Sequence, residues 1–250
     1  MLLLSIAVMI GLWYAFIGLW HLNPFYAKSP KDVWDWLTTG PKAAANRHII
    51  LKGLETTLTD AALGFVGGMV VAVAVAVVFV LYTSVEDTLM PIALVLRSVP
   101  LVALTPLLVL MFGRGLLGAA VIAGLVTFFP TLVNMIVALR GTPPESLDLC
   151  RAYGASAVDT LVKVQIPTAL PALFASLRIA APLALVGALL AEWLATGQGL
   201  GYGLLNAAAS SDYNGLWARV VLITLYSTVI YQLVGIAEGL VMRRFGSAAS

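Results

Sequence analysis

Residues 61–85 read AALGFVGGMVVAVAVAVVFVLYTSV, and no side chain in this run carries a charge. A helix needs about 20 apolar residues to cross the hydrocarbon core of a bilayer, and the run exceeds that length. It is also apolar throughout, whereas the strands of a membrane barrel alternate polar and apolar residues over segments of about ten. Residues 61–85 therefore predict a membrane-spanning α-helix.

Other parts of the chain have the same character. Uncharged apolar runs also occupy residues 1–27, 115–139 and 220–237. Two further hydrophobic runs are interrupted by charges: 89–112 contains Arg97, and 169–195 contains Arg178 and Glu192. Together these runs predict an all-α integral membrane protein with six transmembrane helices.

The composition excludes several other classes of protein. Of 250 residues, 61% are hydrophobic and 10% charged, whereas a soluble domain has about a quarter charged residues. A net charge of +2 with no basic stripe excludes a nucleic-acid binder. The single cysteine, Cys150, excludes an internal disulfide and a CxxC metal site, and two histidines leave little for a metal centre.

Polar segments divide the chain into regions. Residues 1–20 are predicted to form the first transmembrane helix, and residues 21–52, rich in Pro, Lys and Trp, an external or interfacial segment. Residues 53–245 then form a core of five transmembrane helices, which includes a polar loop over 141–168. Lys and Arg occur in loops on both predicted sides, so charge alone does not decide the orientation.

The 141–168 loop is predicted to be two short helices. Proline at positions 143 and 144, followed by Glu145, favours a helix start, and Gly154 interrupts that helix. The stretch from Ser156 to Asp159 is typical of a capping box for a second helix, which is expected to end before Pro167. The loop is therefore predicted to have a defined structure and not to be a flexible linker.

Few residues could support enzyme chemistry. The sequence has neither a phosphate-binding G-x-x-x-x-G-K-[ST] motif nor H-E-x-x-H, so any work driven by ATP must be powered by another chain. An intramembrane enzyme would need a nucleophile beside a base, and Ser156 is the candidate nucleophile. Both histidines precede the second predicted helix, which makes this the weakest of the hypotheses.

Charged residues inside apolar runs are candidate functional residues. Arg97 and Glu192 could line or gate a translocation path, or could form an ion pair that fixes helix packing. Pro100 lies in the same run as Arg97, and together with the prolines at 91 and 106 it is expected to bend or break that helix. Asp60 and Glu238 are placed near helix ends, where snorkelling or capping accounts for them.

Glycine and alanine recur in the predicted transmembrane helices. Pairs four residues apart include Gly64 with Gly68 and Gly187 with Ala191. This spacing lets helix backbones approach closely, either within one subunit or at a dimer interface. Packing within the subunit is the simpler interpretation.

Residues 148–171 resemble the EAA loop of ABC importer permeases. That signature is E-A-A, three residues, Gly, nine residues and I-x-L-P. Here Gly154 has the required spacing to residues 164–167, which end in Ile166 and Pro167. Asp148-Leu-Cys150 stands where Glu-Ala-Ala is usual, so the charge is kept but the two small residues are larger.

Two other stretches are similar to the same family. Residues 97–113, RSVPLVALTPLLVLMFG, resemble its R-x-x-P-x-x-A-L-x-P-L-x-x-x-x-F-G pattern. Residues 191–202, AEWLATGQGLGY, resemble its A-E-x-L to G-L-G-Y segment. The resemblance covers about residues 50–245 and is greatest to the nitrate, sulfonate, taurine and bicarbonate branch.

The resemblance implies a type I importer in the bacterial cytoplasmic (inner) membrane. Such an importer contains two permease subunits, identical or related, a dimer of cytoplasmic ABC ATPases and an external substrate-binding protein. It implies that the 141–168 loop and both termini are cytoplasmic, that the partner ATPase binds ATP and Mg, and that this chain holds no cofactor and is not itself an enzyme. The substrate would be a small solute, an organic or inorganic anion such as a sulfonate or nitrate, although the branch also serves thiamine-precursor, flavin-like and aromatic-acid solutes.

The resemblance also assigns residues. It implies that the ATPase-coupling residues are Asp148, Arg151, Gly154, Ala155, Ser156, Ile166 and Pro167. Arg97, Pro100 and Glu192 remain candidate pathway or gate residues. The alternative function is an ion-coupled secondary transporter, in which neutralising Glu192 would abolish ion dependence.

Overall fold

The computed structural model describes residues 2–245, and every regular element among them is helical. This confirms the all-α prediction. The elements are α1 (Leu2–Leu19), α2 (Pro30–Thr38), α3 (Ala43–Leu81), α4 (Thr83–Ser98), α5 (Leu101–Phe112), α6 (Leu116–Arg140), α7 (Pro144–Ala152), α8 (Ala157–Thr160), the π-helical turn η1 (Leu161–Gln165), α9 (Ile166–Ala191), a second π-helical turn η2 (Glu192–Thr196), α10 (Gly199–Ala209) and α11 (Tyr213–Phe245).

Four helices among the described residues are long and apolar enough to cross a membrane. They are α3, α6, α11 and the continuous helix over 157–196 that joins α8, η1, α9 and η2. The pair α4 and α5 is apolar enough to count as a fifth span, but its two halves meet at an angle of 108°. The helix α1 is apolar but shorter than these.

The structure divides the predicted helix over 89–112 into α4 and α5. The break falls at Val99, whose backbone is extended, and Pro100, which precedes the first residue of α5. Proline disfavours helical geometry in the residue before it and lacks the N–H that would continue the helix. The expectation that proline breaks this run is therefore confirmed at Pro100.

Glycines allow α3, α6 and α9 to pack closely. A Cβ atom added at Gly64 of α3 would lie 2.8 Å from the carbonyl oxygen of Ala120 in α6. A Cβ atom added at Gly187 of α9 would lie 2.6 Å from the Cα of Ala123. Both distances are too short for a real side chain, so these glycines serve packing within the subunit.

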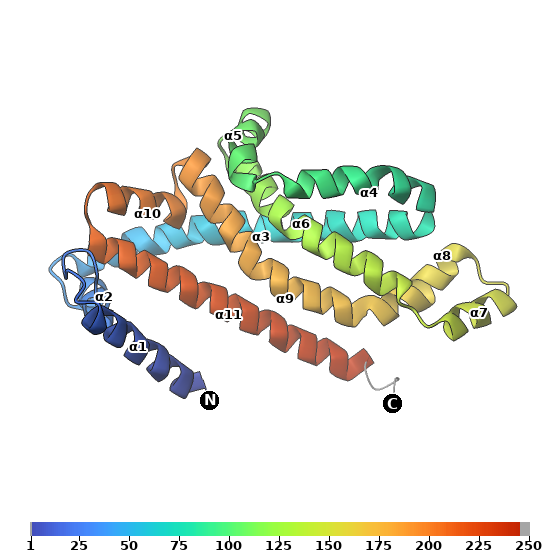
Figure 1. Cartoon of the computed structure of the whole chain (residues 1–250), viewed down its shortest axis with the longest axis horizontal. Coiled ribbons are helices and arrows are strands. Elements are labelled where there is room, and N and C mark those ends of the chain that lie inside the picture. The colour runs from blue at the N-terminus through green and yellow to red at the C-terminus, as the bar shows by residue number, and fades with distance from the viewer. Residues whose placement is uncertain (1, 246–250) are drawn as a thin grey trace.

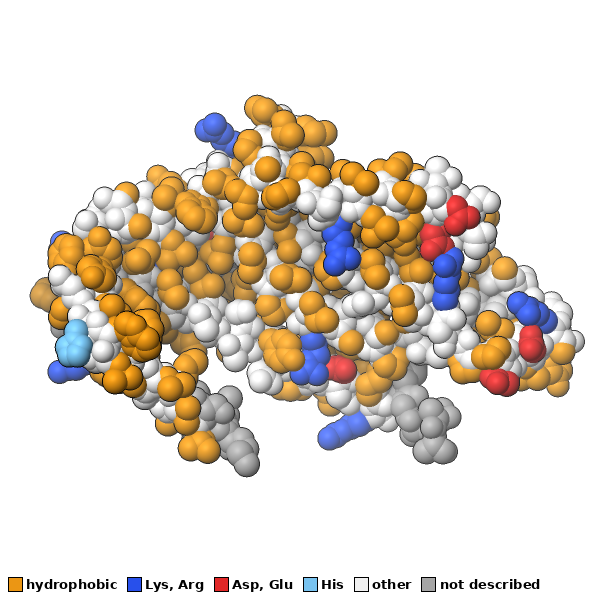
Figure 2. Space-filling model, viewed as in Figure 1, with side chains coloured by type: hydrophobic (Ala, Val, Ile, Leu, Met, Phe, Trp, Pro, Cys, Tyr) orange, Lys and Arg blue, Asp and Glu red, His pale blue; other side chains and the backbone are white. Residues whose placement is uncertain are grey.

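The molecule is elongated, with different elements at its two ends (Figure 1). The short helices α2 and α10 lie at one end, and α7 and α8 lie at the other. Hydrophobic side chains cover much of the face shown in Figure 2, and charged side chains are sparse on it. Such a surface is suited to lipid and to other apolar helices.

Two helix boundaries differ from expectation. The helix α3 begins at Ala43, so the end of the predicted 21–52 segment is already helical. The second short helix of the loop does not end before Pro167 but continues through η1 into α9. Proline is tolerated there because it occupies the first turn of α9, directly after a π-helical turn that changes the hydrogen-bond spacing.

Candidate functional site

The loop over 141–168 forms a compact helix, turn and helix. Pro144 opens α7, and the helix ends in a Schellman motif, in which Gly154 donates to the carbonyl of Arg151 at 3.0 Å and Ala155 donates to that of Cys150 at 2.9 Å. Gly154 has a φ of +71°, a left-handed conformation that glycine adopts without steric cost. The predicted glycine turn is therefore present at Gly154.

The second half of the loop begins with a side-chain cap. The hydroxyl of Ser156 accepts a hydrogen bond from the backbone N–H of Asp159 at 3.1 Å and donates to its carboxylate at 2.6 Å. Lys163 donates to the same carboxylate at 2.6 Å. These contacts stabilise the start of α8, and they confirm Ser156 as the predicted cap, although the Asp159 carboxylate accepts from the hydroxyl of Ser156 and not from its backbone N–H as in a full capping box.

The loop is fastened to the two helices that it connects. The amide of Gln165 donates to the carbonyl oxygen of Leu139, at the end of α6, at 3.1 Å. Leu161 is buried in a cluster that also contains Leu132, Leu139 and Ala169. Because the base of the loop packs into the core, a displacement of the loop must move α6 and α9 with it.

The outer surface of the loop exposes apolar side chains. Tyr153 has 84% of its surface accessible, and Leu149, Val158 and Val162 are also exposed. Asp148 and Arg151 form an exposed ion pair at 3.1 Å. An exposed apolar surface on the loop, at the start of the candidate span over 157–196, is a candidate protein-docking surface.

The predicted coupling residues fall into two groups. Those from Asp148 to Ser156 are exposed on the loop surface, whereas Ile166 is half-buried and Pro167 begins α9. The structure therefore separates a docking surface from the base that joins it to the core. Ser156 acts as a helix cap, which accounts for its hydroxyl without enzyme chemistry.

The candidate pathway residues do not form one site. Arg97 is exposed near the end of α4, Pro100 lies at the break before α5, and Glu192 is fully buried in η2. Within residues 2–245, no hydrogen bond or ion pair joins Arg97 to Glu192. The ion pair considered as their structural role is thus not formed.

Glu192 instead caps the start of α10. Its carboxylate accepts a hydrogen bond from the backbone N–H of Gly201 at 2.7 Å, and Thr57 of α3 accepts one from Leu200 at 2.9 Å. The first N–H groups of a helix have no partner within it, so these side chains satisfy two of them. A side chain at Gly199 would collide with the Glu192 carboxylate, which explains the glycine there.

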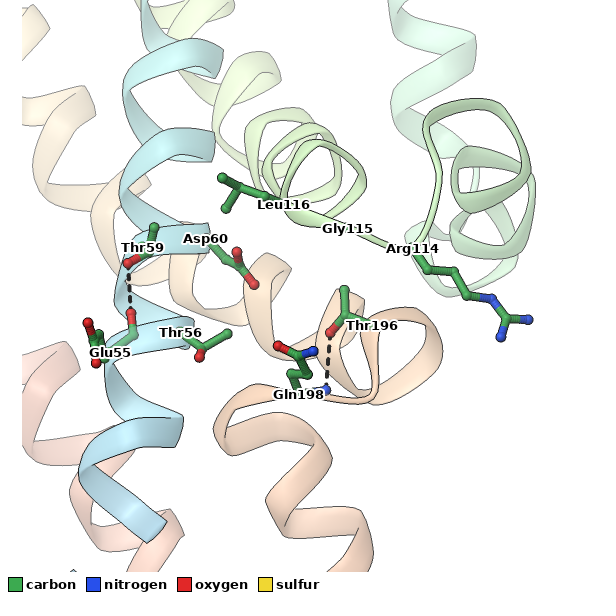
Figure 3. A pocket seen from close by; sticks show the side chains of 9 residues that line it. All are labelled: Glu55, Thr56, Thr59, Asp60, Arg114, Gly115, Leu116, Thr196 and Gln198. Atoms are coloured by element: carbon green, nitrogen blue, oxygen red, sulfur yellow. Dashed lines mark hydrogen bonds between the residues drawn. The ribbon is translucent and has the colours of Figure 1, made fainter. Parts of the chain in front are cut away.

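A polar cavity of about 300 Å³ opens beside this cap, between α3, the turn before α6 and the η2–α10 turn (Figure 3). Its lining residues are Glu55, Thr56, Thr59, Asp60, Arg114, Gly115, Leu116, Thr196 and Gln198. Asp60 lies in the middle of α3 with 4% of its surface accessible, so the expectation that it snorkels from a helix end is wrong. In the described part of the chain, no three His, Cys, Asp or Glu side chains could hold a metal ion.

Sequence reasoning missed α10, Thr57 and the cavity. Gly199, Gly201 and Gly203 lower the helix propensity of α10, and its capping groups come from distant segments. The sequence offered one signal for this cap, namely that Glu192 lies only a few residues before these glycines. Their contact depends on the η2 turn and on Gly197, whose φ is +68°.

The fold is similar to that of a solved ABC transporter. An inward-facing structure of the MetNI methionine ABC transporter matches with a TM-score of 0.63 and 22% sequence identity, over 83% of this chain and 99% of that one. At this identity the match shows the fold. It supports the arrangement of helices described above.

Three relatives indicate the family more directly. A probable ABC transporter permease protein of Haemophilus influenzae is 29% identical over 92% of this chain and 91% of its own length. The formylaminopyrimidine transport permease protein ThiX of Halalkalibacterium halodurans is 30% identical over 69% of each chain. The putative aliphatic sulfonates transport permease protein SsuC of Bacillus subtilis is 25% identical over 94% of this chain and 84% of its own length.

The family match spans most of the chain. Residues 64–247 match the binding-protein-dependent transport system inner membrane component family. The matched region contains both the loop over 141–168 and the Glu192 cap. With the relatives above, it shows that this chain belongs to that family of ABC transporter permeases.

Proposed function

We propose that this chain is the membrane-spanning permease subunit of an ATP-driven importer, and that residues 141–168 dock on a cytoplasmic ATPase. The observation that carries the proposal is the exposed apolar surface around Tyr153 on a loop whose base is packed into the core. One segment thus has both features that coupling requires: an exposed surface that a partner can bind and a rigid connection to the helices that must move.

The rigidity of the loop matters for the mechanism. The Schellman motif at Gly154 and the cap at Ser156 hold α7 and α8 in one arrangement, and Gln165 ties the loop to α6. A partner that closes on ATP would then displace α6 and α9 as a rigid body. Hydrolysis would release the partner and return the helices.

The proposal includes a membrane topology. Six crossings would be formed by α1, α3, the bent pair α4–α5, α6, α9 and α11. With the 141–168 loop in the cytoplasm, both termini are cytoplasmic, and α2 and α10 lie on the external side. In support, α2 and α10 lie together at the end of the molecule remote from α7 and α8 (Figure 1).

The proposed partners follow from this assignment. An ATPase dimer binds ATP and Mg, a second permease subunit completes the translocation path, and an external binding protein delivers the solute. This chain acts without a cofactor and without catalysis of its own. The family match gives no support to the alternative of an ion-coupled secondary transporter.

The relatives indicate two chemical classes of substrate. The sulfonate permease of Bacillus subtilis favours an organic or inorganic anion, as the resemblance to the sulfonate and nitrate branch also implied. The formylaminopyrimidine permease favours a nitrogen-rich heterocycle. Both are small solutes, and the path through this chain is proposed to carry one of them.

Co-purification in mild detergent tests the proposed docking. The wild-type chain is expected to retain an ABC ATPase with ATP hydrolysis activity, and Y153A is expected to weaken that association by about tenfold, as for a truncated interface anchor. The matched control is Y14A, which removes an exposed tyrosine from α1. Full retention of the ATPase by Y153A, or no bound ATPase in the wild type, would overturn the proposal.

A further inference from the structure

The cavity in Figure 3 lies in the half of the molecule remote from α7 and α8. It has a volume of about 300 Å³, enough for a small solute, and it opens to the surface. Its walls come from three separate parts of the chain: the middle of α3, the turn at 114–116 and the turn at 196–198. The cavity therefore lies where several elements meet, as ligand sites commonly do.

Asp60 is the buried charged group of this cavity. Only 4% of the surface of Asp60 is accessible, and its carboxylate forms no hydrogen bond or ion pair with any side chain or backbone group that the structure describes. Figure 3 shows the carboxylate directed into the space between the three walls. The protein supplies no donor to this carboxylate, which opens to the cavity, so a ligand there can supply the donor.

The charges around the cavity disfavour an anion. Glu55, from the same helix, is a second lining carboxylate. Arg114 is the lining cation, and Figure 3 shows the side chains of both Arg114 and Glu55 directed away from Asp60. An anion between the walls would therefore be repelled by the Asp60 carboxylate, whereas a cation or an N–H donor would be attracted to it.

The remaining polar groups can bind a neutral polar solute. The hydroxyl of Thr59 donates to the carbonyl of Glu55 at 2.8 Å, which leaves its oxygen able to accept another hydrogen bond. Thr196 and the exposed amide of Gln198 line the opposite wall. Together these groups add several hydrogen-bond acceptors to the lining of the cavity.

We propose that this cavity is a contact site for the transported solute, and that Asp60 selects small solutes bearing an N–H donor, such as protonated amines or amino-heterocycles, over sulfonate and inorganic anions. The proposal rests on the proposed function, because it assigns the substrate class of the importer. Of the two substrate classes that the relatives indicate, the proposal favours the nitrogen-rich heterocycle over the anion.

Thiol labelling tests the charge preference without knowledge of the natural solute. The T56C variant is made in the full-length chain with C150A, which removes the single native cysteine, and is reconstituted in lipid nanodiscs. Its labelling rates with cationic aminoethyl methanethiosulfonate and anionic sulfonatoethyl methanethiosulfonate are compared with those of free 2-mercaptoethanol. We expect the ratio of cationic to anionic labelling at T56C to exceed the free-thiol ratio by about tenfold.

A second substitution assigns the preference to Asp60. Adding D60N, which keeps the shape of the side chain, is expected to reduce the ratio by about threefold or more. D87N removes an exposed carboxylate outside the cavity and is expected to leave the ratio unchanged. A ratio equal to that of the free thiol, or one that D60N leaves unchanged, would overturn the proposal.

Transport by the assembled complex tests the substrate class itself. The complex with its ATPase and binding protein is reconstituted in liposomes, and import of formylaminopyrimidine is compared with import of taurine. We expect import of the pyrimidine, reduced about tenfold by D60N, as for loss of a charged hydrogen-bond partner. Import of taurine that D60N does not affect would overturn the proposal.

The proposed function can fail separately. Its failure appears as absence of a bound ATPase in the co-purification experiment, a result that depends on neither Asp60 nor the labelling ratio. Neutralising an unpaired buried carboxylate is not expected to unfold the chain. ATPase association measured for D60N therefore shows whether a loss of import comes from the cavity or from misassembly.

Discussion

The carboxylate of Glu192 and the backbone N–H of Gly201 form a hydrogen bond of 2.7 Å that joins the end of the candidate span over 157–196 to the start of α10. Glu192 is fully buried, and the second carboxylate oxygen has no hydrogen-bond partner in the described residues. The side chain of Glu192 therefore caps α10. If it also affects transport, it would do so by holding α10 in place.

Substitution of Glu192 distinguishes these roles. E192A leaves the Gly201 N–H without an acceptor and creates a cavity, so we expect it to lower the free energy of unfolding by about 2–4 kcal/mol. E192Q keeps an acceptor for that N–H and is expected to lose less than half as much. Thermal unfolding in detergent measures both variants.

Transport provides the control for this prediction. If Glu192 mainly positions α10, E192Q should retain most of the import activity of the assembled complex. Abolished import in E192Q with unchanged stability would contradict the capping role and would restore Glu192 as a gate residue.

Two neighbouring glycines of α3 offer a matched pair for the packing of α3 on α6. A Cβ atom added at Gly68 would lie 2.9 Å from the Cα of Gly124, with no space to accept it, whereas one at Gly67 would meet no atom within 4 Å. We expect G68A to destabilise the protein by about 1–3 kcal/mol through overpacking. G67A is expected to be neutral or to stabilise the helix by up to about 1 kcal/mol.

Thermal unfolding of both glycine variants gives the comparison. Equal stability of G68A and G67A would show that the close approach of α3 and α6 does not contribute to folding. A loss of dimerisation in G68A without a loss of subunit stability would favour the dimer interface, the other interpretation of the small-residue spacing.

The apolar helices of this fold can be predicted from the sequence, because their hydrophobicity is a local property of each segment. The uncharged runs predict the apolar parts of α3, α6 and α11, since a bilayer tolerates few charges. Counting residues between charges misjudged the start of α3, because residues 43–60 include Arg47, Lys52 and Glu55 and are helical all the same. Outside the hydrocarbon core a helix can carry charges, so their presence does not mark its end.

The loop and the cavity show the difference between local and distant determinants. The glycine turn at Gly154 and the cap at Ser156 are determined by neighbouring residues, and the sequence predicts both correctly. The cap of α10 by Glu192 and Thr57 and the burial of Asp60 depend on how distant segments pack. No local pattern reports such packing.

The short helix α2 is expected to depend on pH through its cap. The backbone N–H and hydroxyl of Ser29 both donate to the carboxylate of Asp32 at 2.8 Å, and the backbone hydrogen bond is the main reason that the pKa of Asp32 is lowered from its usual value of 3.8. A pKa that is lower in the folded state stabilises the helix above the unfolded pKa. This stabilisation is lost as the pH falls through the folded pKa.

Hydrogen exchange of residues 30–38, corrected for intrinsic rates, measures this effect. We expect protection of α2 to fall below about pH 4 in the wild type, and D32N to lower protection at neutral pH and remove that pH dependence. D35N changes a carboxylate of the same helix that is not part of the cap and should keep the wild-type profile. A wild-type profile in D32N would contradict the assignment of the cap.

An ion pair between α9 and α11 is the last feature open to a direct test. Arg178 donates to the carboxylate of Glu238 at 3.1 Å and to the hydroxyl of Tyr231 at 3.1 Å, and its guanidinium lies 4.7 Å from the centre of the Tyr231 ring. Glu238 therefore has a specific partner, which the interpretation of a snorkelling helix-end residue did not anticipate. Both charged side chains are partly exposed, so their interaction energy must be measured and not inferred from distance.

A double-mutant cycle with R178A and E238A measures that energy. Because the two side chains touch, we expect their effects on the free energy of unfolding to be non-additive by about 0.5–2 kcal/mol. R178K keeps the charge but loses the planar group that contacts both partners, and it should recover only part of the loss. Additive single substitutions would show that the pair does not hold α11 against α9, and that the apolar contacts between these helices suffice.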